Sequence, residues 1–235
     1  MSPSSTPLLI TAVSIGLVHT LAGPDHYVPF IALARSGRWS LRKTALVTFL
    51  CGLGHILSSV LLGLIGVALG VAVTRIEGAE AVRGGIAAWA MIAFGLVYFA
   101  WGLRRAIRNR PHQHPHLHDG ALHTHEHTHR QEHLHVHESG AGRTTPWVLF
   151  IIFLFGPCEP LIPLLMYPAA KGNPAGAAVV AGVFGVTTIA TMLGVVLLAT
   201  LGVGLLPTAR LERYTHALAG AAILLCGLAI QFLGL

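Results

Sequence analysis

The sequence predicts an all-α integral membrane protein with six transmembrane helices, arranged as two inverted three-helix repeats with helices broken at Gly-Pro motifs. Of the 235 residues, 54% are hydrophobic and only 10% are charged, whereas soluble domains carry about 25% charged residues. Apolar stretches of about 20 residues, the length that crosses a bilayer, separate the charged clusters. The two halves of the chain also share motifs at a nearly constant spacing. These three observations leave no room for a soluble domain.

The six spans are expected at residues 7–31, 45–73, 84–103, 147–169, 175–206 and 214–234. The second and fifth are long, which predicts tilted helices or helices broken near their glycines. Three segments follow: a membrane repeat over 1–109, a His-rich loop over 110–143 and a second membrane repeat over 144–235. The basic start of a cleavable signal peptide is missing before the first span, so the N-terminus is expected to be retained.

The distribution of basic residues predicts the orientation, because cytoplasmic loops retain Lys and Arg during insertion. The connections after the first, third and fifth spans hold Arg35, Arg38, Arg42, Lys43, Arg104, Arg105, Arg108, Arg110, Arg130, Arg143, Arg210 and Arg213. The other connections hold only Arg75, Arg83 and Lys171. We therefore expect a plasma membrane protein, of the bacterial inner-membrane type, with both termini outside and the His-rich loop in the cytoplasm. This orientation accounts for the excess of positive charge, so no nucleic-acid partner is expected.

An internal repeat relates the two halves at an offset of 131–133 residues. The matched positions are Gly23-Pro24-Asp25-His26 with Gly156-Pro157-Cys158-Glu159, Gly54 with Gly185, Gly63 with Gly194, Gly95 with Gly227, and Gly102 with Gly234. Each unit has three spans, an odd number, so the second copy is expected to lie upside down relative to the first. In transporters built this way, broken helices meet near the bilayer midplane and form the substrate site. Gly23, Pro24, Gly156 and Pro157 are the predicted helix breaks.

A small set of polar residues lies inside the predicted spans. Its members are His19, Asp25, His26, His55, Cys158 and Glu159. Ionisable groups at membrane depth cost several kcal/mol, which makes them a functional hypothesis by default. Imidazoles, carboxylates and a thiol together suit borderline divalent transition metals, whereas magnesium and calcium prefer oxygen ligands. The sequence thus predicts a transport site for a metal ion. The alternative is that His55 and Cys158 are interior polar groups bonded to neighbouring helices.

The central loop is dense in histidine. It holds His112, His114, His116, His118, His123, His125, His127, His129, His133, His135 and His137. The alternating His-x-His pattern lets an irregular chain place several imidazoles around one ion, and the tract lacks the apolar residues to fold alone. We expect an auxiliary metal-binding tether there; the alternative is a solvated polar linker.

The motif His19-Thr20-Leu21-Ala22-Gly23-Pro24-Asp25-His26 resembles the nickel/cobalt transporter superfamily, especially its nickel/cobalt efflux and urease-accessory-like membrane proteins. In that superfamily a similar His and Asp-His signature in an early helix is followed by a Gly-His motif, here Gly54-His55, and by an acidic motif in the second half, here at Glu159. Two departures stand out. Five residues rather than four precede Asp-His, and Cys158-Glu159 replaces the acidic motif of the uptake permeases.

The resemblance implies a secondary transporter of Ni²⁺, Co²⁺ or another divalent transition-metal cation, with export favoured over import. We expect no enzymatic activity and no prosthetic group; the transported ion is the ligand. The expected partners are the lipid bilayer and the metal ion. A metallochaperone or nickel-enzyme accessory protein, and a homo-oligomer, are further candidate partners. The sequence has no nucleotide-binding motif of the Gly-x(4)-Gly-Lys-Ser/Thr type, so energy would come from a gradient or a separate subunit.

Three alternatives remain. One is a membrane thiol–disulfide carrier, because the segment around Cys158 resembles the Pro-Cys-x-x-Pro motifs of electron-transferring cytochrome-maturation proteins; the first-half equivalent of Cys158 is Asp25, which argues against it. Another is an exporter of sulfite or small organosulfur anions, disfavoured because no basic residue lies within a predicted span. The last is a nickel-enzyme accessory protein that binds metal through its histidine loop.

Overall fold

A computed structural model describes residues 5–108, 112–118, 121–127, 141–204 and 211–234 of the chain. The first half contains α1 (Ser5–Ala22), the 3₁₀ turn η1 (Pro24–His26), α2 (Val28–Ser36), α3 (Leu41–Ala68) and α4 (Val73–Arg108). A hairpin of β1 (His112–His118) and β2 (Ala121–His127) follows. The second half contains α5 (Ala141–Phe155), α6 (Leu161–Ala170), α7 (Pro174–Gly204), η2 (Glu212–Tyr214) and α8 (Thr215–Leu233).

The helices make this chain a multi-pass membrane protein. Four of those described are long and apolar enough to cross a bilayer: Leu41–Ala68, Val73–Arg108, Pro174–Val203 and Glu212–Leu233. A bent pair, Thr6–Ala22 with Pro24–Ser36, passes the same test as one span broken by an angle of 83°. The helical membrane class is confirmed, with four spans, or five if the bent pair counts as one.

The fourth predicted span, over 147–169, is broken at its Gly-Pro motif as expected, but neither of its two helices is long enough to cross a bilayer alone. That stretch is divided between α5 and α6, which are 15 and 10 residues long. A ten-residue helix rises only about 15 Å, half the thickness of the hydrocarbon core. The break between them lies at Gly156 and Pro157, where the helical hydrogen bonding stops.

The third predicted span is also corrected, because α4 begins at Val73 rather than at residue 84. Its first turns carry four charged residues that the sequence suggested were a loop: Arg75, Glu77, Glu80 and Arg83. Glu80 and Arg83 form an ion pair one helical turn apart, with Nη1 and Oε1 3.1 Å apart. Mutual neutralisation lets this part of the helix enter the apolar interior.

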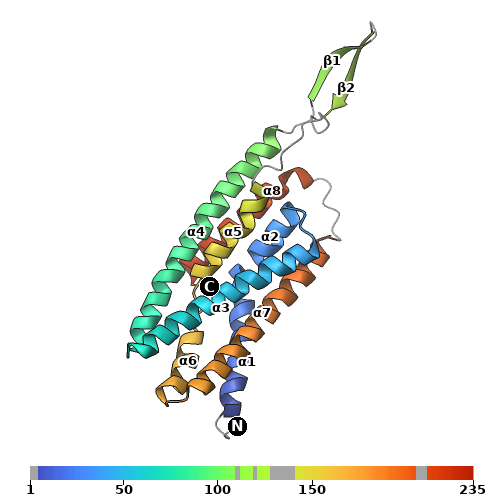
Figure 1. The fold of residues 1–235 in the computed structure, drawn as a ribbon. Helices are drawn as coiled ribbons and strands as arrows, with labels where there is room; N and C mark the ends of the chain where they lie inside the picture. The colour runs from blue at the N-terminus through green and yellow to red at the C-terminus, as the bar shows by residue number, and fades with distance from the viewer. Residues whose placement is uncertain (1–4, 109–111, 119–120, 128–140, 205–210, 235) are drawn as a thin grey trace.

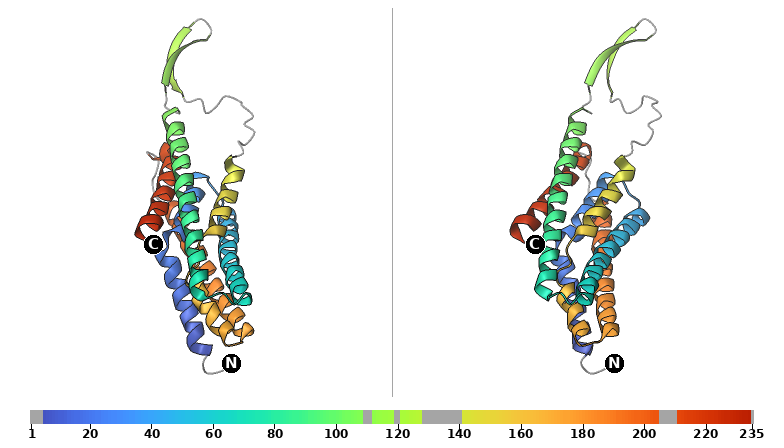
Figure 2. Two further views of the ribbon diagram at one scale, coloured as in Figure 1. Left: turned by 90° about the vertical axis from the view of Figure 1, so that its left-hand side faces the viewer. Right: turned by 60° about the vertical axis from the view of Figure 1, so that its left-hand side comes forward.

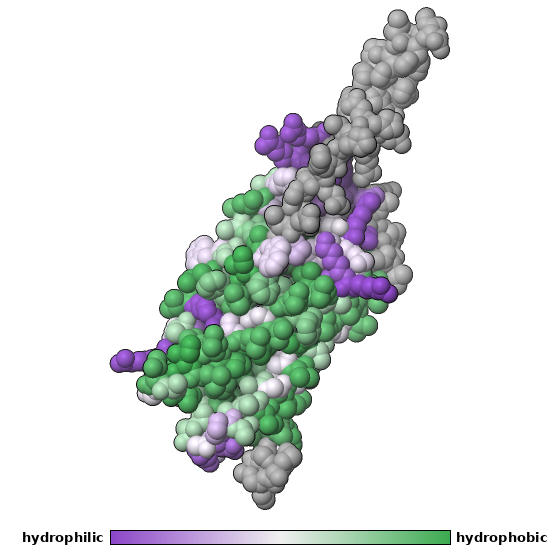
Figure 3. Space-filling view, viewed as in Figure 1, coloured by the Kyte–Doolittle hydropathy of each residue, from purple (hydrophilic) through white to green (hydrophobic). Residues whose placement is uncertain are grey.

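The described helices pack side by side in one apolar bundle (Figures 1 and 2). α4 packs along α8, α1 lies against α7, and α3 contacts α5, α6 and α7. α2 ends and α8 begins at the upper end of Figure 1, whereas the turns from α3 to α4 and from α6 to α7 lie at the lower end. Apolar residues cover most of the visible flank in Figure 3, and side chains such as Val186 and Leu198 are more than 70% exposed. This surface suits contact with lipid.

Glycines with a positive φ end three of the described helices. Gly70 (φ 62°) follows α3, Gly172 (φ 69°) follows α6 and Gly234 (φ 67°) follows α8. This left-handed conformation is one that glycine adopts without steric cost. At the opposite end of α3, the Ser40 side chain accepts a hydrogen bond from the backbone N–H of Lys43, as an N-cap does.

The described part of the histidine tract is a hairpin and not the irregular loop that its composition predicts. β1 and β2 pair antiparallel in a register that sets His112 against His127, His114 against His125, and His116 against His123. In Figure 1 the hairpin extends beyond the upper end of α4. His129, His133, His135 and His137 lie outside the described residues. Metal binding by this tract stays a prediction.

Close packing of α4 on α8 depends on glycines from both helices. A Cβ added at Gly95 would lie 2.5 Å from the backbone nitrogen of Leu224, and one at Gly220 would collide with the backbone of Phe99. Gly102 has a similar relation to Ala217. Such close backbone approach through small residues is how helices associate without a hydrophobic driving force.

We therefore expect Gly220→Val to lower the free energy of unfolding by about 1–3 kcal/mol, the usual cost of overpacking. The measurement is the midpoint of denaturant-induced unfolding in detergent. Gly182→Val is the matched control, because a Cβ at Gly182 meets nothing within 4 Å. Equal midpoints for the two variants would contradict the packing role of Gly220.

Candidate functional site

The first half of the site forms where α1 breaks. His19 lies in the last turn of α1, which ends at Ala22. Gly23 is extended (φ −85°, ψ 102°), and Pro24 begins the 3₁₀ turn that carries Asp25 and His26. Proline fixes its own φ and disfavours helix for the residue before it. The sequence His-x₃-Gly-Pro-Asp-His therefore cannot continue as one helix, and the turn brings His26 back towards His19.

Three histidines meet at this break. The ring centroids are 4.7 Å apart for His19 and His26, 5.2 Å for His26 and His55, and 6.4 Å for His19 and His55. Each ring offers one nitrogen within 4.8 Å of the corresponding atoms of the other two. His26 and His55 are buried, and α3 supplies His55 from the middle of its length. We call these three residues the histidine cluster.

Asp25 orients one member of this cluster. Its Oδ1 lies 3.0 Å from Nδ1 of His26, and the carbonyl oxygen of Gly23 lies 3.2 Å from the same nitrogen. Both neighbours accept hydrogen bonds, so Nδ1 of His26 must carry the proton. Nε2 of His26 is left buried without a hydrogen-bond partner. A carboxylate that holds one imidazole nitrogen in this way fixes the ring and its tautomer.

The glycines of both breaks make room for the site. A Cβ added at Gly23 would lie 2.6 Å from Nδ1 of His26 and 2.7 Å from Oδ1 of Asp25. A Cβ at Gly156 would lie 3.0 Å from Nδ1 of His55. The Gly-Pro motifs therefore do two things: they stop the helices and they allow side chains to approach the backbone.

The second break brings a thiol to the cluster. α5 ends at Phe155 and α6 begins at Leu161, and Cys158 lies in the irregular segment between them. The Cys158 side chain is fully buried, and its Sγ is 4.0 Å from Nε2 of His19. An imidazole at this position can accept the thiol proton. Cys51 and Cys226 are also free and buried, and they pack in a different hydrophobic cluster from Cys158.

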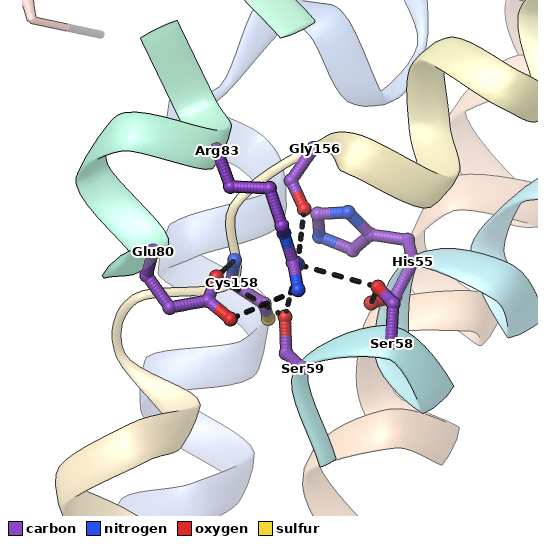
Figure 4. A network of polar contacts seen from close by, with 7 residues as sticks. All are labelled: His55, Ser58, Ser59, Glu80, Arg83, Gly156 and Cys158. Carbon is purple, nitrogen blue, oxygen red and sulfur yellow. Dashed lines mark hydrogen bonds and ion pairs between the residues drawn. The ribbon is translucent and has the colours of Figure 1, made fainter. Parts of the chain in front are cut away.

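An ion pair that the sequence did not single out supports the second break (Figure 4). The backbone N–H of Cys158 donates to Oε2 of Glu80 over 3.1 Å. Arg83 donates to the carbonyl oxygen of Gly156 over 2.8 Å and to the hydroxyl oxygen of Ser59 over 2.7 Å. Glu80 is fully buried and Arg83 is 15% exposed. The pair thus connects α4 to α3 and to the backbone on both sides of Pro157.

A narrow cavity of about 20 Å³ opens beside the cluster. Asp25, His55 and Gly156 line it together with apolar residues of α4, α5 and α8, among them Met91 and Phe153. A space of this volume admits about one water molecule or one ion. Two polar side chains of the first half therefore face a small void that residues of both halves enclose.

The predicted site residues do not all meet. His19, His26 and His55 form the cluster, Asp25 bonds to His26, and Cys158 lies beside His19. Glu159, which was expected to supply a carboxylate from the second half, is exposed. Glu80 provides the buried carboxylate beside Cys158 instead. The signal for it was the spacing of Glu80 and Arg83, three residues apart on one helix face, where opposite charges pair.

One family model matches residues 26–229, under the description "Cytochrome C biogenesis protein transmembrane region". The match covers both membrane halves and the segment between them. The chain belongs to this family. No curated protein and no solved structure matches it.

Membership in the cytochrome c biogenesis family corrects the resemblance to the nickel/cobalt transporters, which was wrong. The prediction that nickel or cobalt transport is the main function is therefore also wrong. A Gly-Pro break followed by Asp-His at membrane depth is therefore not specific to metal permeases. The two departures from the transporter motifs, in the spacing before Asp25-His26 and at Cys158-Glu159, correctly indicated a different family. The family favours the alternative of a membrane thiol–disulfide carrier.

The expectation that no basic residue lies within a span is wrong, because Arg83 lies inside α4 and reaches the second break. Its guanidinium is neutralised by Glu80, however, and three of its contacts go to protein oxygens. The positive charge is thus already compensated, and an anion would have to displace Glu80.

Proposed function

We propose that this protein is a membrane thiol–disulfide carrier of cytochrome c biogenesis in which Cys158 is the reactive thiol. The observation that carries the proposal is the position of Cys158 at a helix break, with its sulfur beside the imidazole of His19. Membership in the cytochrome c biogenesis family supports it. In this proposal the protein carries disulfide exchange and does not convert a metabolite as an enzyme would.

The two halves divide the chemistry between them. The first-half counterpart of Cys158 is Asp25, which bonds to His26 and cannot form a disulfide. The first half therefore supplies proton-accepting groups, and the second half supplies the thiol. A chain with a single cysteine at its site cannot store an internal disulfide there. Each exchange must pass through a mixed disulfide with an external thiol compound.

The exchange balances in two steps. Cys158 gives its proton to Nε2 of His19, and the thiolate attacks a disulfide R–S–S–R′, forming Cys158–S–S–R and releasing R′–S⁻, which takes the proton. A second thiol R″–SH then attacks the mixed disulfide, releases Cys158 and forms R–S–S–R″. The reducing equivalents of R″–SH end on R′–SH. Because Cys158 is fully buried, the break between α5 and α6 must open for each step.

The segment around Cys158 holds its sulfur in place for attack. Full burial and the nearby carboxylate of Glu80 disfavour a resting thiolate, so the proton must pass to His19 at the moment of attack. The backbone N–H of Cys158 is fixed by Glu80 and the carbonyl of Gly156 by Arg83, so the segment is held at two points. The sulfur is held in reach of His19, which is the geometry that base-assisted attack requires.

The membrane arrangement belongs to the same proposal. We propose six spans in two inverted three-helix units, with α5 and α6 together forming the fourth span. The contacts support it: α1 and α2 pack on α7, as α5 and α6 pack on α3, and the equivalent helices α4 and α8 pack on each other. The Lys and Arg distribution favours a plasma membrane protein with both termini outside and the histidine tract inside.

Capture of the mixed disulfide tests the proposal. Membranes containing the full chain are treated with an aromatic disulfide, quenched with acid and analysed by peptide mass spectrometry. We expect the adduct on Cys158 to form faster than on Cys51 or Cys226, because among the described residues an imidazole bonds to the sulfur of Cys158 alone. Equal labelling of the three cysteines, or labelling of Cys51 or Cys226 first, would contradict the assignment.

A further inference from the structure

The histidine cluster has buried nitrogens that the thiol reaction does not use. Among the described residues, Nε2 of His26 and both ring nitrogens of His55 have no hydrogen-bond partner. The side chains of His26 and His55 are 2% and 1% exposed. Buried polar groups without a partner are costly and rare in native proteins. One such nitrogen from each of the two rings lies within 4.8 Å of the other and of His19, which indicates a ligand bound between them.

The chemistry of these nitrogens indicates a metal ion. Nδ1 of His26 carries the proton because it faces two acceptors, so Nε2 offers a lone pair. A hydrogen-bond acceptor such as a carboxylate ligand would not pair with that lone pair, whereas a transition-metal cation would. Imidazole nitrogens are ligands that zinc and other borderline divalent ions prefer. The Asp25 carboxylate behind His26 completes the arrangement usual at such sites.

The distances agree with one ion bound by all three rings. The three ligand nitrogens lie within 4.8 Å of one another. A tetrahedral zinc ion at about 2.0–2.1 Å from each nitrogen would separate them by about 3.4 Å. Small rotations of the rings close this difference. The cavity lined by Asp25 and His55 lies beside the cluster and has room for one water molecule.

We propose that His19, His26 and His55 bind one divalent transition-metal ion of the zinc type, with Asp25 orienting His26. This metal site goes beyond the proposed thiol exchange, and the two use His19 in different states: the ring accepts the Cys158 proton only when no metal is bound to it. Three protein ligands with an open position define a site that keeps one water or exchangeable ligand. Asp25 is thus a positioning residue, and the site is assembled from α1, η1 and α3 only.

The test must separate this site from the histidine tract. The full chain is purified in detergent with the eleven histidines of 112–137 replaced by serine, and is titrated with Co²⁺ as a spectroscopic probe and with Zn²⁺. We expect one equivalent of Co²⁺ with the visible absorption of a four-coordinate ion, displaced by Zn²⁺. In the same background, His26→Gln and His55→Gln should lose this signal.

Two further variants guard against loss of the fold. Asp25→Asn keeps all three ligands and is expected to weaken metal binding about 10–100-fold, as the loss of an orienting carboxylate does. His216→Gln is the matched control, because His216 bonds to Tyr98 away from the cluster. It should bind Co²⁺ like its parent. An unchanged affinity in Asp25→Asn, or an unchanged Co²⁺ spectrum in a folded His26→Gln variant, would overturn the proposal.

Discussion

Replacing Cys158 with alanine is expected to reduce thiol–disulfide exchange across vesicles to the rate of protein-free vesicles. The sulfur is the atom that forms and breaks bonds in both steps, and no other cysteine lies beside a histidine among the described residues. The assay uses proteoliposomes with a membrane-impermeant thiol inside and a reporter disulfide outside. His19→Gln should retain the thiol but slow the exchange by about 10²–10⁴-fold, the usual contribution of a general base.

The matched controls for this prediction are Cys51→Ala and Cys226→Ala. Both cysteines are buried and free like Cys158, but they pack in the core cluster around Phe30 and Met192. Their loss should leave the exchange rate within about twofold of the parent chain. If Cys158→Ala kept the parent rate while remaining folded, the thiol mechanism would have to be abandoned.

Removal of Arg83 is expected to destabilise the protein by about 3–5 kcal/mol, the cost of leaving a buried charge without its partner. Arg83→Met leaves the carboxylate of Glu80 fully buried and removes the hydrogen bonds to Ser59 and to the carbonyl of Gly156. The backbone on both sides of Pro157 then loses one of its two supports. The free energy of unfolding in detergent, from a denaturant titration, measures the effect.

The double variant Glu80→Leu/Arg83→Met separates the charge effect from the loss of contacts. Replacing both members of a buried ion pair with apolar residues is often close to neutral. We therefore expect the double variant to be more stable than Arg83→Met alone. Arg75→Met, in the first turn of the same helix, is the control and should change the unfolding free energy by less than about 0.5 kcal/mol. A double variant as unstable as Arg83→Met would show that the contacts dominate.

The helical segments could be predicted from composition alone because lipid leaves few options. A chain with 10% charged residues and apolar stretches of about 20 must satisfy its backbone hydrogen bonds within helices. The break points followed equally directly from Gly23-Pro24 and Gly156-Pro157, since proline cannot donate the hydrogen bond that continues a helix. The structure interrupts the helices at both places.

The beginning of α4 was predicted less well. A charged stretch containing Glu80 and Arg83 is typical of a loop when the charge of each residue is considered separately. In the helix, the two side chains neutralise each other and bond to residues more than 20 positions away in the sequence. Hydropathy is averaged over neighbours along the chain, so it does not include partners that are distant in the sequence. The buried carboxylate of the site was consequently assigned to Glu159 instead of Glu80.

The membrane class, the places where the helices break and the residue types near the breaks follow from local properties of the chain: hydropathy, proline geometry and charge. Which polar groups meet is a property of the fold, because it depends on how α1, α3, α4 and the segment before α6 pack together. The fold brought His55 to His19 and His26, set Cys158 beside an imidazole and left Glu159 exposed. The chemistry of the site follows from those contacts, and a motif read along the chain does not contain them.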